Sequence, residues 1–320
     1  MGKYIAKRIL AAIPLLFIIS LIVFSLIQLA PYDVVDSLIT PNMPEEMINL
    51  LRTRYGLDQP LIIRYLNWLQ NILIGDFGNS LANGSSISAE LAVRIPNTIR
   101  LILPAYVTAL TLAIILGMVA GANKNKLIDK IIDGFCSFGI AAPTFWVAML
   151  LIYFFGLRLG WFPIIGMYTI GGNHDFADYL RHFVMPFTTL TLAFFPSLTR
   201  YIRMSTIVQV NEDYVMIQKA FHATKWEIFS RHVSRNILIP VVTQIGMALP
   251  MLVTGAVITE SIFSWPGVGP YLMSATRAMD YPVIMALMLL SAILVILGNL
   301  LSDILYSIVD PRIRREGDAK

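Results

Sequence analysis

Long apolar stretches without charge alternate with polar segments along this chain. Six stretches contain no Asp, Glu, Lys, Arg or His, and they meet or approach the roughly 20 residues that a helix needs to cross about 30 Å of hydrocarbon. They are residues 9–30, 101–122, 134–157, 183–199, 237–259 and 281–302. None shows the period-two polarity of a membrane barrel, and backbone amides in lipid must be satisfied within the segment. The pattern therefore predicts an all-α polytopic membrane protein with about six transmembrane helices.

Prolines interrupt several of these predicted spans. They are Pro14, Pro104, Pro143, Pro196 and Pro250. Membrane helices tolerate proline as a kink, because neighbouring groups can satisfy the backbone that it frees. Kinked helices that line a route and simple tolerance of proline are equally compatible with the pattern.

Lysine and arginine fall mainly on one side of the predicted spans. Such an excess marks the cytoplasmic side. The cytoplasmic clusters are Lys3, Lys7 and Arg8; Lys124, Lys126 and Lys130; Arg200, Arg203, Lys219, Lys225, Arg231 and Arg235; and Arg312, Arg314, Arg315 and Lys320. Both termini are therefore expected in the cytoplasm.

This topology divides the chain into four parts. Residues 1–30 form an N-terminal tail and the first span, and residues 31–100 form an extracytoplasmic cap with helical periodicity over 45–55 and 61–74. Residues 101–310 form a core of five spans that includes a long cytoplasmic segment, 204–236. Residues 311–320 form a cytoplasmic tail.

The composition indicates a membrane protein, and the sequence contains no motif that is typical of an enzyme. Apolar residues make up 57% of the chain and charged residues 14%, a balance that a soluble protein rarely shows. The single cysteine, Cys136, is expected to be a small buried hydrophobe. No Gly-x-x-x-x-Gly-Lys-Ser/Thr loop is present to bind nucleotide phosphates, and no catalytic serine or zinc-protease motif appears. Neither enzymatic activity nor a cofactor is expected.

Titratable groups inside the spans are scarce. His174 beside Asp175 fits either a metal ligand pair or, better, a solvated loop, and His182 is a lone histidine near an interface. Glu260 and Asp303 each close a span where interfacial water is within reach. An ion-coupled secondary carrier would need buried coupling acids, and a membrane enzyme would need a convergent set of titratable groups. The sequence favours neither class, and no metal site is predicted.

The cytoplasmic segment 204–236 contains two short amphipathic helices. They are predicted over 213–221 and 224–232, with Asn211 or Asp213 able to cap the first. Trp226 and Phe229 are expected to be exposed beside basic side chains. Such a pair can dock into a partner's groove or lie on anionic lipid headgroups.

Motifs along nearly the whole chain resemble the permeases of ABC importers, and more narrowly the first permease subunit of the dipeptide, oligopeptide and nickel importers. The cytoplasmic motif is Glu212-Asp213-Tyr214-Val215 followed by Lys219-Ala220, Arg231-His232, Arg235-Asn236 and Pro240. The other motifs are Tyr4-Ile5-x-Lys7-Arg8, Ala30-Pro31-x-Asp33, residues 55–61, Gly75-Asp76-Phe77-Gly78-x-Ser80, Arg94-x-Pro96-x-Thr98, Pro143-x-Phe145-Trp146, Glu260-x-Ile262-Phe263-Ser264-Trp265-Pro266-Gly267-Val268-Gly269, residues 280–283 and residues 310–314.

This resemblance implies a type I ABC-importer permease fold in the bacterial cytoplasmic membrane. It also implies a second, similar permease as a heterodimer partner, two cytoplasmic ATPase subunits and an extracytoplasmic substrate-binding protein. ATP binding would drive alternating access through the cytoplasmic helices. The implied cargo is small peptides, with nickel or a metal chelate as the alternative.

The resemblance also assigns the functional residues. The coupling segment, residues 213–232, would meet the ATPase through its central turn, residues 221–226. The residues concerned are Asp213, Ala220, Phe221, His222, Ala223, Thr224, Lys225, Trp226, Arg231 and His232. The outer turn, residues 264–269, would form either a gate or an aromatic anchor at the membrane interface through Trp265, Pro266, Gly267 and Gly269.

Two positions depart from the family pattern. His222 stands where the coupling motif usually has glycine, which suits a turn with positive φ; histidine can adopt such a turn at a cost of about 1 kcal/mol. Either the turn is re-shaped here, or His222 itself contacts the partner. Tyr32 stands where glycine often precedes the aspartate.

Overall fold

A computed structural model describes residues 2–29, 35–36, 39–40, 42–248 and 256–309. These residues are helical apart from turns and one isolated bridge between Asn79 and Ser86. In chain order the elements are α1 Gly2–Gln28, α2 Glu45–Arg54, α3 Leu61–Leu73, α4 Ile87–Ala122, α5 Leu127–Ala141, α6 Thr144–Leu151, η1 Ile152–Arg158, α7 Phe176–Val210, α8 Asp213–Ala220, α9 Lys225–Glu227, η2 Ile228–Val233, α10 Ser234–Ala248, α12 Val257–Ile262, α13 Val268–Arg277 and α14 Tyr281–Val309. The expectation of an all-α chain is confirmed for this part.

The centre of the fold is the packing of α4 against α7. Small residues recur every fourth position along the buried face of α4, which lets the two backbones approach closely. They are Ala105, Ala109, Ala113, Gly117 and Gly121. A Cβ at Gly117 would lie 2.8 Å from the carbonyl oxygen of Thr199, and one at Gly121 would lie 2.5 Å from Thr206 Cβ. Any larger side chain at either position would push the two helices apart.

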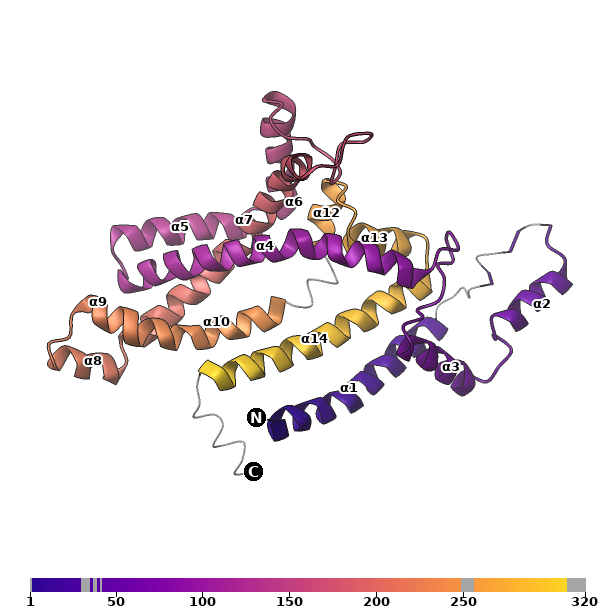
Figure 1. The fold of residues 1–320 in the computed structure, drawn as a ribbon, viewed down its shortest axis with the longest axis horizontal. Coiled ribbons are helices and arrows are strands. Elements are labelled where there is room, and N and C mark those ends of the chain that lie inside the picture. The colour runs from indigo at the N-terminus through magenta and orange to yellow at the C-terminus, as the bar shows by residue number, and fades with distance from the viewer. Residues whose placement is uncertain (1, 30–34, 37–38, 41, 249–255, 310–320) are drawn as a thin grey trace.

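Figure 1 shows the elements sorted between two ends of the bundle. The α8–α9 hairpin, the turn from α4 to α5, the start of α1 and the end of α14 lie toward one end. The helices α2 and α3, the start of α4 and α13 lie toward the other. The segments named here that are predicted to be cytoplasmic thus lie toward one end, and those predicted to be extracytoplasmic lie mainly toward the other.

The third predicted span, residues 134–157, is two helices rather than one. α5 ends at Ala141, and the helix that follows leaves at an angle of 96°. Ala142 takes an extended conformation with φ −75° and ψ 120°, as the residue before a proline prefers. Pro143 therefore breaks the span instead of merely bending it, and α6 and η1 stand away from the α4–α5 layer (Figure 1).

Other predicted spans differ from the structure in their limits. The helix α4 begins at Ile87, within the predicted cap, and α7 extends well beyond residues 183–199 on both sides. The fifth span, 237–259, includes α10 and the start of α12, while residues 249–255 between them, Pro250 included, lie outside the described residues. Predictions for Ala30-Pro31-x-Asp33, Tyr32 and the tail 311–320 also fall outside the described part.

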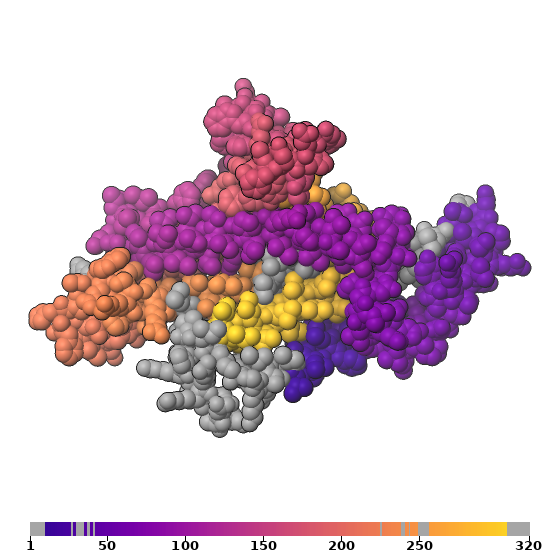
Figure 2. Space-filling view, in the orientation of Figure 1, coloured from indigo at the N-terminus to yellow at the C-terminus, as the bar shows by residue number. Residues whose placement is uncertain are grey.

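By length and hydropathy, two described helices can each cross a membrane. They are Ile87–Ala122 and Tyr281–Leu305, and the bent pair of α5 with α6 and η1 adds a third if it counts as one span. In α1 the apolar stretch Leu10–Leu26 is shorter. Figure 2 shows α4 crossing one face of the molecule. The large exposed apolar side chains of α4 are Val93, Leu103, Val107, Leu112 and Ile115.

The cap is held to the core at two points. The Ser20 hydroxyl of α1 and the Tyr65 hydroxyl of α3 lie 2.7 Å apart in a buried hydrogen bond. Farther along, Ser80 donates a 2.5 Å hydrogen bond to Asp280, whose carboxylate also accepts from the backbone N–H of Leu81. Asp280 directly precedes α14 and is only 2% exposed. The cap is therefore fixed to both the first and the last long helix.

Candidate functional site

The coupling segment, residues 213–232, forms a helical hairpin between α7 and α10. α8 confirms the first predicted helix to within one residue. The second predicted helix is α9 followed by a π-helical turn, η2. Val215, Ile228 and Val233 are buried in one apolar cluster with Ile202 of α7 and Ile237 of α10. The base of the hairpin is thus part of the core.

The tip of this hairpin carries two large exposed aromatic side chains. Phe221 is 79% exposed and Trp226 is 78% exposed. His222 and Thr224 between them are exposed as well, whereas Ala223 is partly buried. Exposed aromatic side chains of this size, on a hairpin whose base is buried, are typical of a surface that binds another protein. The side chain of Lys225 lies outside the described residues.

The turn after α8 has the hydrogen bonds of a Schellman motif. His222 N–H donates to Lys219 O at 3.0 Å, and Ala223 N–H donates to Gln218 O at 3.1 Å. His222 has φ +59°, the left-handed conformation that glycine adopts without strain. Histidine therefore adopts a positive-φ turn at this position.

Polar contacts within the hairpin are local. Arg231 pairs with Glu227 at 3.2 Å, and the ring of His232 lies 6.4 Å from that of Tyr214, whose pKa is raised by burial. Asp213 opens α8, but Glu212 precedes it without a side-chain cap. The predicted cap by Asn211 is wrong, because its amide donates to Ile207 O at 2.8 Å and so closes α7 instead.

A buried ion pair supports the helices above the hairpin. Arg203 of α7 donates two hydrogen bonds to Asp129 of α5, at 2.5 and 2.8 Å. The Asp129 carboxylate also accepts from the backbone N–H of Asn125 in the turn from α4 to α5, and its side chain is 2% exposed. One carboxylate therefore ties α4, α5 and α7 together near the coupling segment.

At the other end, the outer turn is held by a buried carboxylate. Glu260 is fully buried and accepts hydrogen bonds from the Thr98 hydroxyl at 2.8 Å and from the Gly269 N–H at 2.7 Å. Thr98 in turn accepts from the N–H of Val268 at 2.8 Å. A Cβ on Gly267 would collide with the Glu260 carboxylate and with Thr98 Oγ1. Glycine is required here by close packing, since α4 and the turn share this carboxylate.

The side chain of Trp265 belongs to the same network. It is fully buried, and its indole N–H donates to Asn97 O at 2.9 Å, while the Asn97 amide donates to Pro266 O at 3.0 Å. A buried indole does not match the alternative of an anchor among lipid headgroups. The outer turn instead is packed onto α4 through Asn97 and Thr98.

The loop residues His174 and Asp175, for which the sequence favours a solvated loop over a metal ligand pair, serve structural roles in the described part. Asp175 caps α7 by accepting from the N–H of Asp178 at 2.7 Å, and His174 stacks on Tyr168. Hydrogen bonds from the Thr169 hydroxyl and N–H lower the pKa of Asp178. No group of three or more His, Cys, Asp or Glu side chains converges within the described residues.

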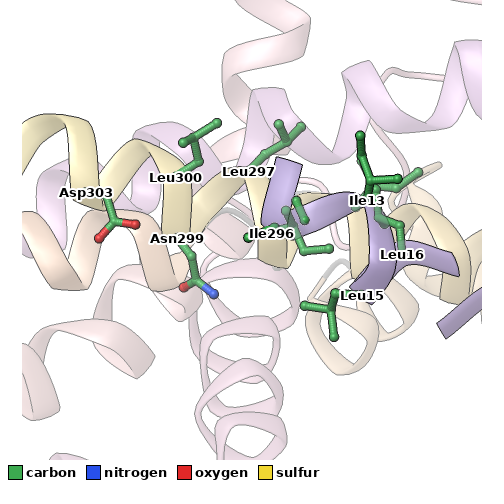
Figure 3. Close-up of a pocket in the computed structure, with 11 residues that line it drawn as sticks. Ile13, Leu15, Leu16, Ile296, Leu297, Asn299, Leu300 and Asp303 are labelled. Atoms are coloured by element: carbon green, nitrogen blue, oxygen red, sulfur yellow. The ribbon is translucent and has the colours of Figure 1, made fainter. Parts of the chain in front are cut away.

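A cavity of about 300 Å³ lies between α1 and α14. Figure 3 shows that its wall is largely leucine and isoleucine from both helices, with the polar ends of Asn299 and Asp303 on α14. Asp303 thus lies beside this apolar cavity at the predicted inner end of the sixth span.

Several residues that organise the two sites were not singled out from the sequence. They are Ser80, Asn97, Thr98, Asp129, Arg203 and Asp280. Ser80, Thr98 and Asp280 stand inside the motifs quoted above, so the motifs indicated the segments but not their pairing. The sequence indicates Arg203 only as a basic residue of the predicted cytoplasmic side, and it gives no signal that singles out Asp129.

Comparison with known proteins identifies the family. Residues 1–102 match the family described as the N-terminal part of a binding-protein-dependent transport system membrane component. Residues 113–315 match the family described as binding-protein-dependent transport system inner membrane component.

Curated relatives match almost end to end. The oligopeptide transport system permease protein AppB of Bacillus subtilis (strain 168) is 36% identical over 314 residues, covering 98% of this chain and 99% of AppB. The glutathione transport system permease protein GsiC of Escherichia coli (strain K12) is 34% identical over 314 residues, with the same coverage.

Among solved structures, the fold is similar to a chain of the inward-facing MetNI methionine ABC transporter. The TM-score is 0.51 at 15% identity, over 69% of this chain and 96% of that one. At that identity the likeness concerns the fold alone. Taken with the two family matches, it means that the chain belongs to the binding-protein-dependent transport system inner membrane components: it is the permease of an ABC transporter and is not itself an ATPase.

Proposed function

We propose that this permease imports small peptides as one half of a heterodimer with a second, similar permease. It crosses the bacterial cytoplasmic membrane six times with both termini inside, and the coupling segment docks on a cytoplasmic ATPase. The observation that carries this proposal is the exposed pair Phe221 and Trp226 at the tip of a hairpin whose base is buried in the core. Because the base cannot move independently, a push on the tip moves α7 and α10.

The proposed cargo rests on the relatives and on peptide chemistry. AppB is named for oligopeptides and GsiC for glutathione, which is itself a tripeptide. Nickel or a metal chelate is the alternative within the same family. Uptake of labelled trialanine and of ⁶³Ni²⁺ into vesicles holding the complete transporter separates the two. Uptake of nickel without the peptide would refute the proposed cargo.

The coupling role is open to a site-specific crosslinking test. Cys136 is the only cysteine and is fully buried, so a cysteine introduced by Thr224→Cys is the one accessible thiol of this chain. We expect a short thiol crosslinker to join that cysteine to the ATPase subunit. The matched control is Ser85→Cys in the cap, which should give no such product. Equal crosslinking at both positions would refute the assignment.

The aromatic tip should also determine the strength of assembly. Large aromatic side chains at the centre of an interface often cost about 2 kcal/mol or more when truncated, and so weaken binding roughly thirtyfold. We expect Trp226→Ala to reduce co-purification of the ATPase accordingly. Trp146→Ala on α6, which is 43% exposed and far from the hairpin in sequence, is the control and should leave assembly unchanged.

A further inference from the structure

A cavity of about 710 Å³ opens beside the outer turn. Its walls come from the end of α12, the turn itself and one side of α13. The lining residues include Ser261, Ser264, Trp265, Pro266, Met273 and Arg277. Arg277 is the only charged side chain among them. The cavity thus combines serine hydroxyls and one guanidinium with apolar side chains, among them the buried indole of Trp265.

The guanidinium of Arg277 has no acidic partner in the described structure. The stretch 257–280 contains three charged residues, and the other two are already engaged. Glu260 accepts from Thr98 and Gly269, and Asp280 accepts from Ser80 and Leu81. The exposed side chain of Arg277 is therefore left as an uncompensated positive charge at the cavity.

Two hydroxyl groups in the cavity are free as well. Ser261 and Ser264 are exposed, and neither hydroxyl makes a hydrogen bond within the described residues. Ser264 also has φ +50°, a strained conformation for a residue with a side chain. The turn keeps this conformation because Trp265 on one side is locked to α4 through Asn97. The backbone that carries the Ser264 hydroxyl is therefore fixed before any ligand arrives.

A planar guanidinium with nearby hydroxyl donors matches the geometry of a carboxylate. We infer that this cavity binds a carboxylate at the outer entrance of the permease, with Arg277 as the ion partner and Ser261 and Ser264 as hydrogen-bond donors. The inference rests on the proposed function, because a small peptide presents a free carboxylate at its C-terminus. The substrate-binding protein, when docked at this face, is the other source of the same group.

The test measures directly whether a bound group protects the Arg277 guanidinium, and it does not depend on transport. Phenylglyoxal modifies accessible guanidinium groups, and mass spectrometry follows each arginine separately. The complete transporter is labelled alone, with trialanine, with trialanine amide, and with the substrate-binding protein free of peptide. Arg181, exposed on α7 and absent from the cavity, is the internal reference in every sample.

Each outcome decides the question. A carboxylate bound by charge-assisted hydrogen bonds should slow labelling of Arg277 about tenfold relative to Arg181. Protection by trialanine but not by its amide assigns the cavity to the peptide, and protection by the peptide-free binding protein alone assigns it to the receptor. If neither the peptide nor the binding protein changes the labelling of Arg277 relative to Arg181, the inference is overturned. Failure of peptide uptake by the unmodified transporter would instead refute the proposed cargo, since labelling is read without transport.

Variants give a second, functional reading. Arg277→Gln removes the charge, Arg277→Lys keeps it without the planar fork, and Arg181→Gln is the matched control. We expect ATP hydrolysis stimulated by the loaded binding protein to fall about tenfold in the Gln variant and less in the Lys variant. Loss of the same size in Arg277→Gln and Arg181→Gln would contradict a specific site, and so would an unchanged rate in Arg277→Gln.

Discussion

Thr98 and Glu260 are joined by a 2.8 Å hydrogen bond although 162 residues separate them in the chain, and both side chains are fully buried. Thr98 lies on α4 and Glu260 lies on α12, so the contact joins the central helix to the outer turn. Burying the Glu260 carboxylate without its hydrogen-bond donors would destabilise the fold by several kcal/mol. The outer turn and α4 are therefore expected to move together during transport rather than past one another.

Gly267→Ala tests that attachment. The new methyl group would meet the Glu260 carboxylate and lie 2.5 Å from Thr98 Oγ1, so the turn must shift. We expect a loss of roughly 1–3 kcal/mol, typical of overpacking, measured as a lower thermal midpoint of the purified permease. Gly134→Ala on α5 is the control, because nothing lies within 4 Å of its Cβ and alanine favours a helix. Equal midpoints for both variants would show that the turn is not held in this way.

His222→Gly should stabilise the coupling segment. The substitution removes the strain of a left-handed residue, about 1 kcal/mol, while both Schellman hydrogen bonds remain. Slower amide exchange over residues 213–223 would report it, with the ATPase still co-purifying. Ala220→Gly, two residues earlier within α8, should change stability in the opposite direction. Loss of the ATPase from His222→Gly alone would show that the imidazole itself makes the contact.

Arg203→Leu should destabilise the inner end of the bundle strongly. It leaves the Asp129 carboxylate buried with only the Asn125 N–H, and removing one partner of a buried pair costs roughly 3–5 kcal/mol. The neighbouring pair Arg200 and Asp133 is 3.4 Å apart and about half exposed on the arginine side. Arg200→Leu should therefore cost less than about 1 kcal/mol. Chemical denaturation in detergent compares the two, and similar losses would contradict the distinction between them.

The loop before α7 should loosen at acidic pH. Hydrogen bonds from Thr169 lower the pKa of Asp178 in the folded protein. The carboxylate's contribution is therefore complete above its unfolded pKa of about 3.9 and is lost as the pH falls through the lower folded value. Exchange of the Thr169 amide, corrected for its intrinsic pH dependence, should accelerate as the pH falls below about 4, through the lowered folded pKa of Asp178. Asp178→Asn should abolish this dependence, and a persistent transition would point to another group.

Local patterns in the sequence predicted the helices better than their ends. The predicted helices 45–55 and 61–74 match α2 and α3 closely, because amphipathic periodicity and flanking prolines are local signals. The span limits were less accurate, since charge was taken as the end of a span. Glu90, Arg94 and Arg100 all lie on α4, because this helix begins at Ile87, well before the apolar stretch 101–122.

Pairing between distant segments could not be read from the sequence. The motif around Thr98 and the motif around Glu260 were both identified, yet nothing local indicates that they share one hydrogen bond. The same holds for Ser80 with Asp280 and for Arg203 with Asp129. Such contacts depend on how helices cross, which the spacing of small residues on α4 helps to set. That spacing was visible in the sequence and is the signal that could have placed α7 beside α4.

The continuity of α7 has a mechanical consequence. Its 35 residues run without a break from the loop at Asp175 to the coupling segment, a length of about 50 Å at 1.5 Å per residue. A rod of that length converts a tilt of roughly 5° at one end into a displacement of roughly 4 Å at the other. A tilt delivered by the hairpin at residues 213–232 is therefore carried along the whole of α7 and displaces the far end of that helix, beside Asp175, with no intervening break.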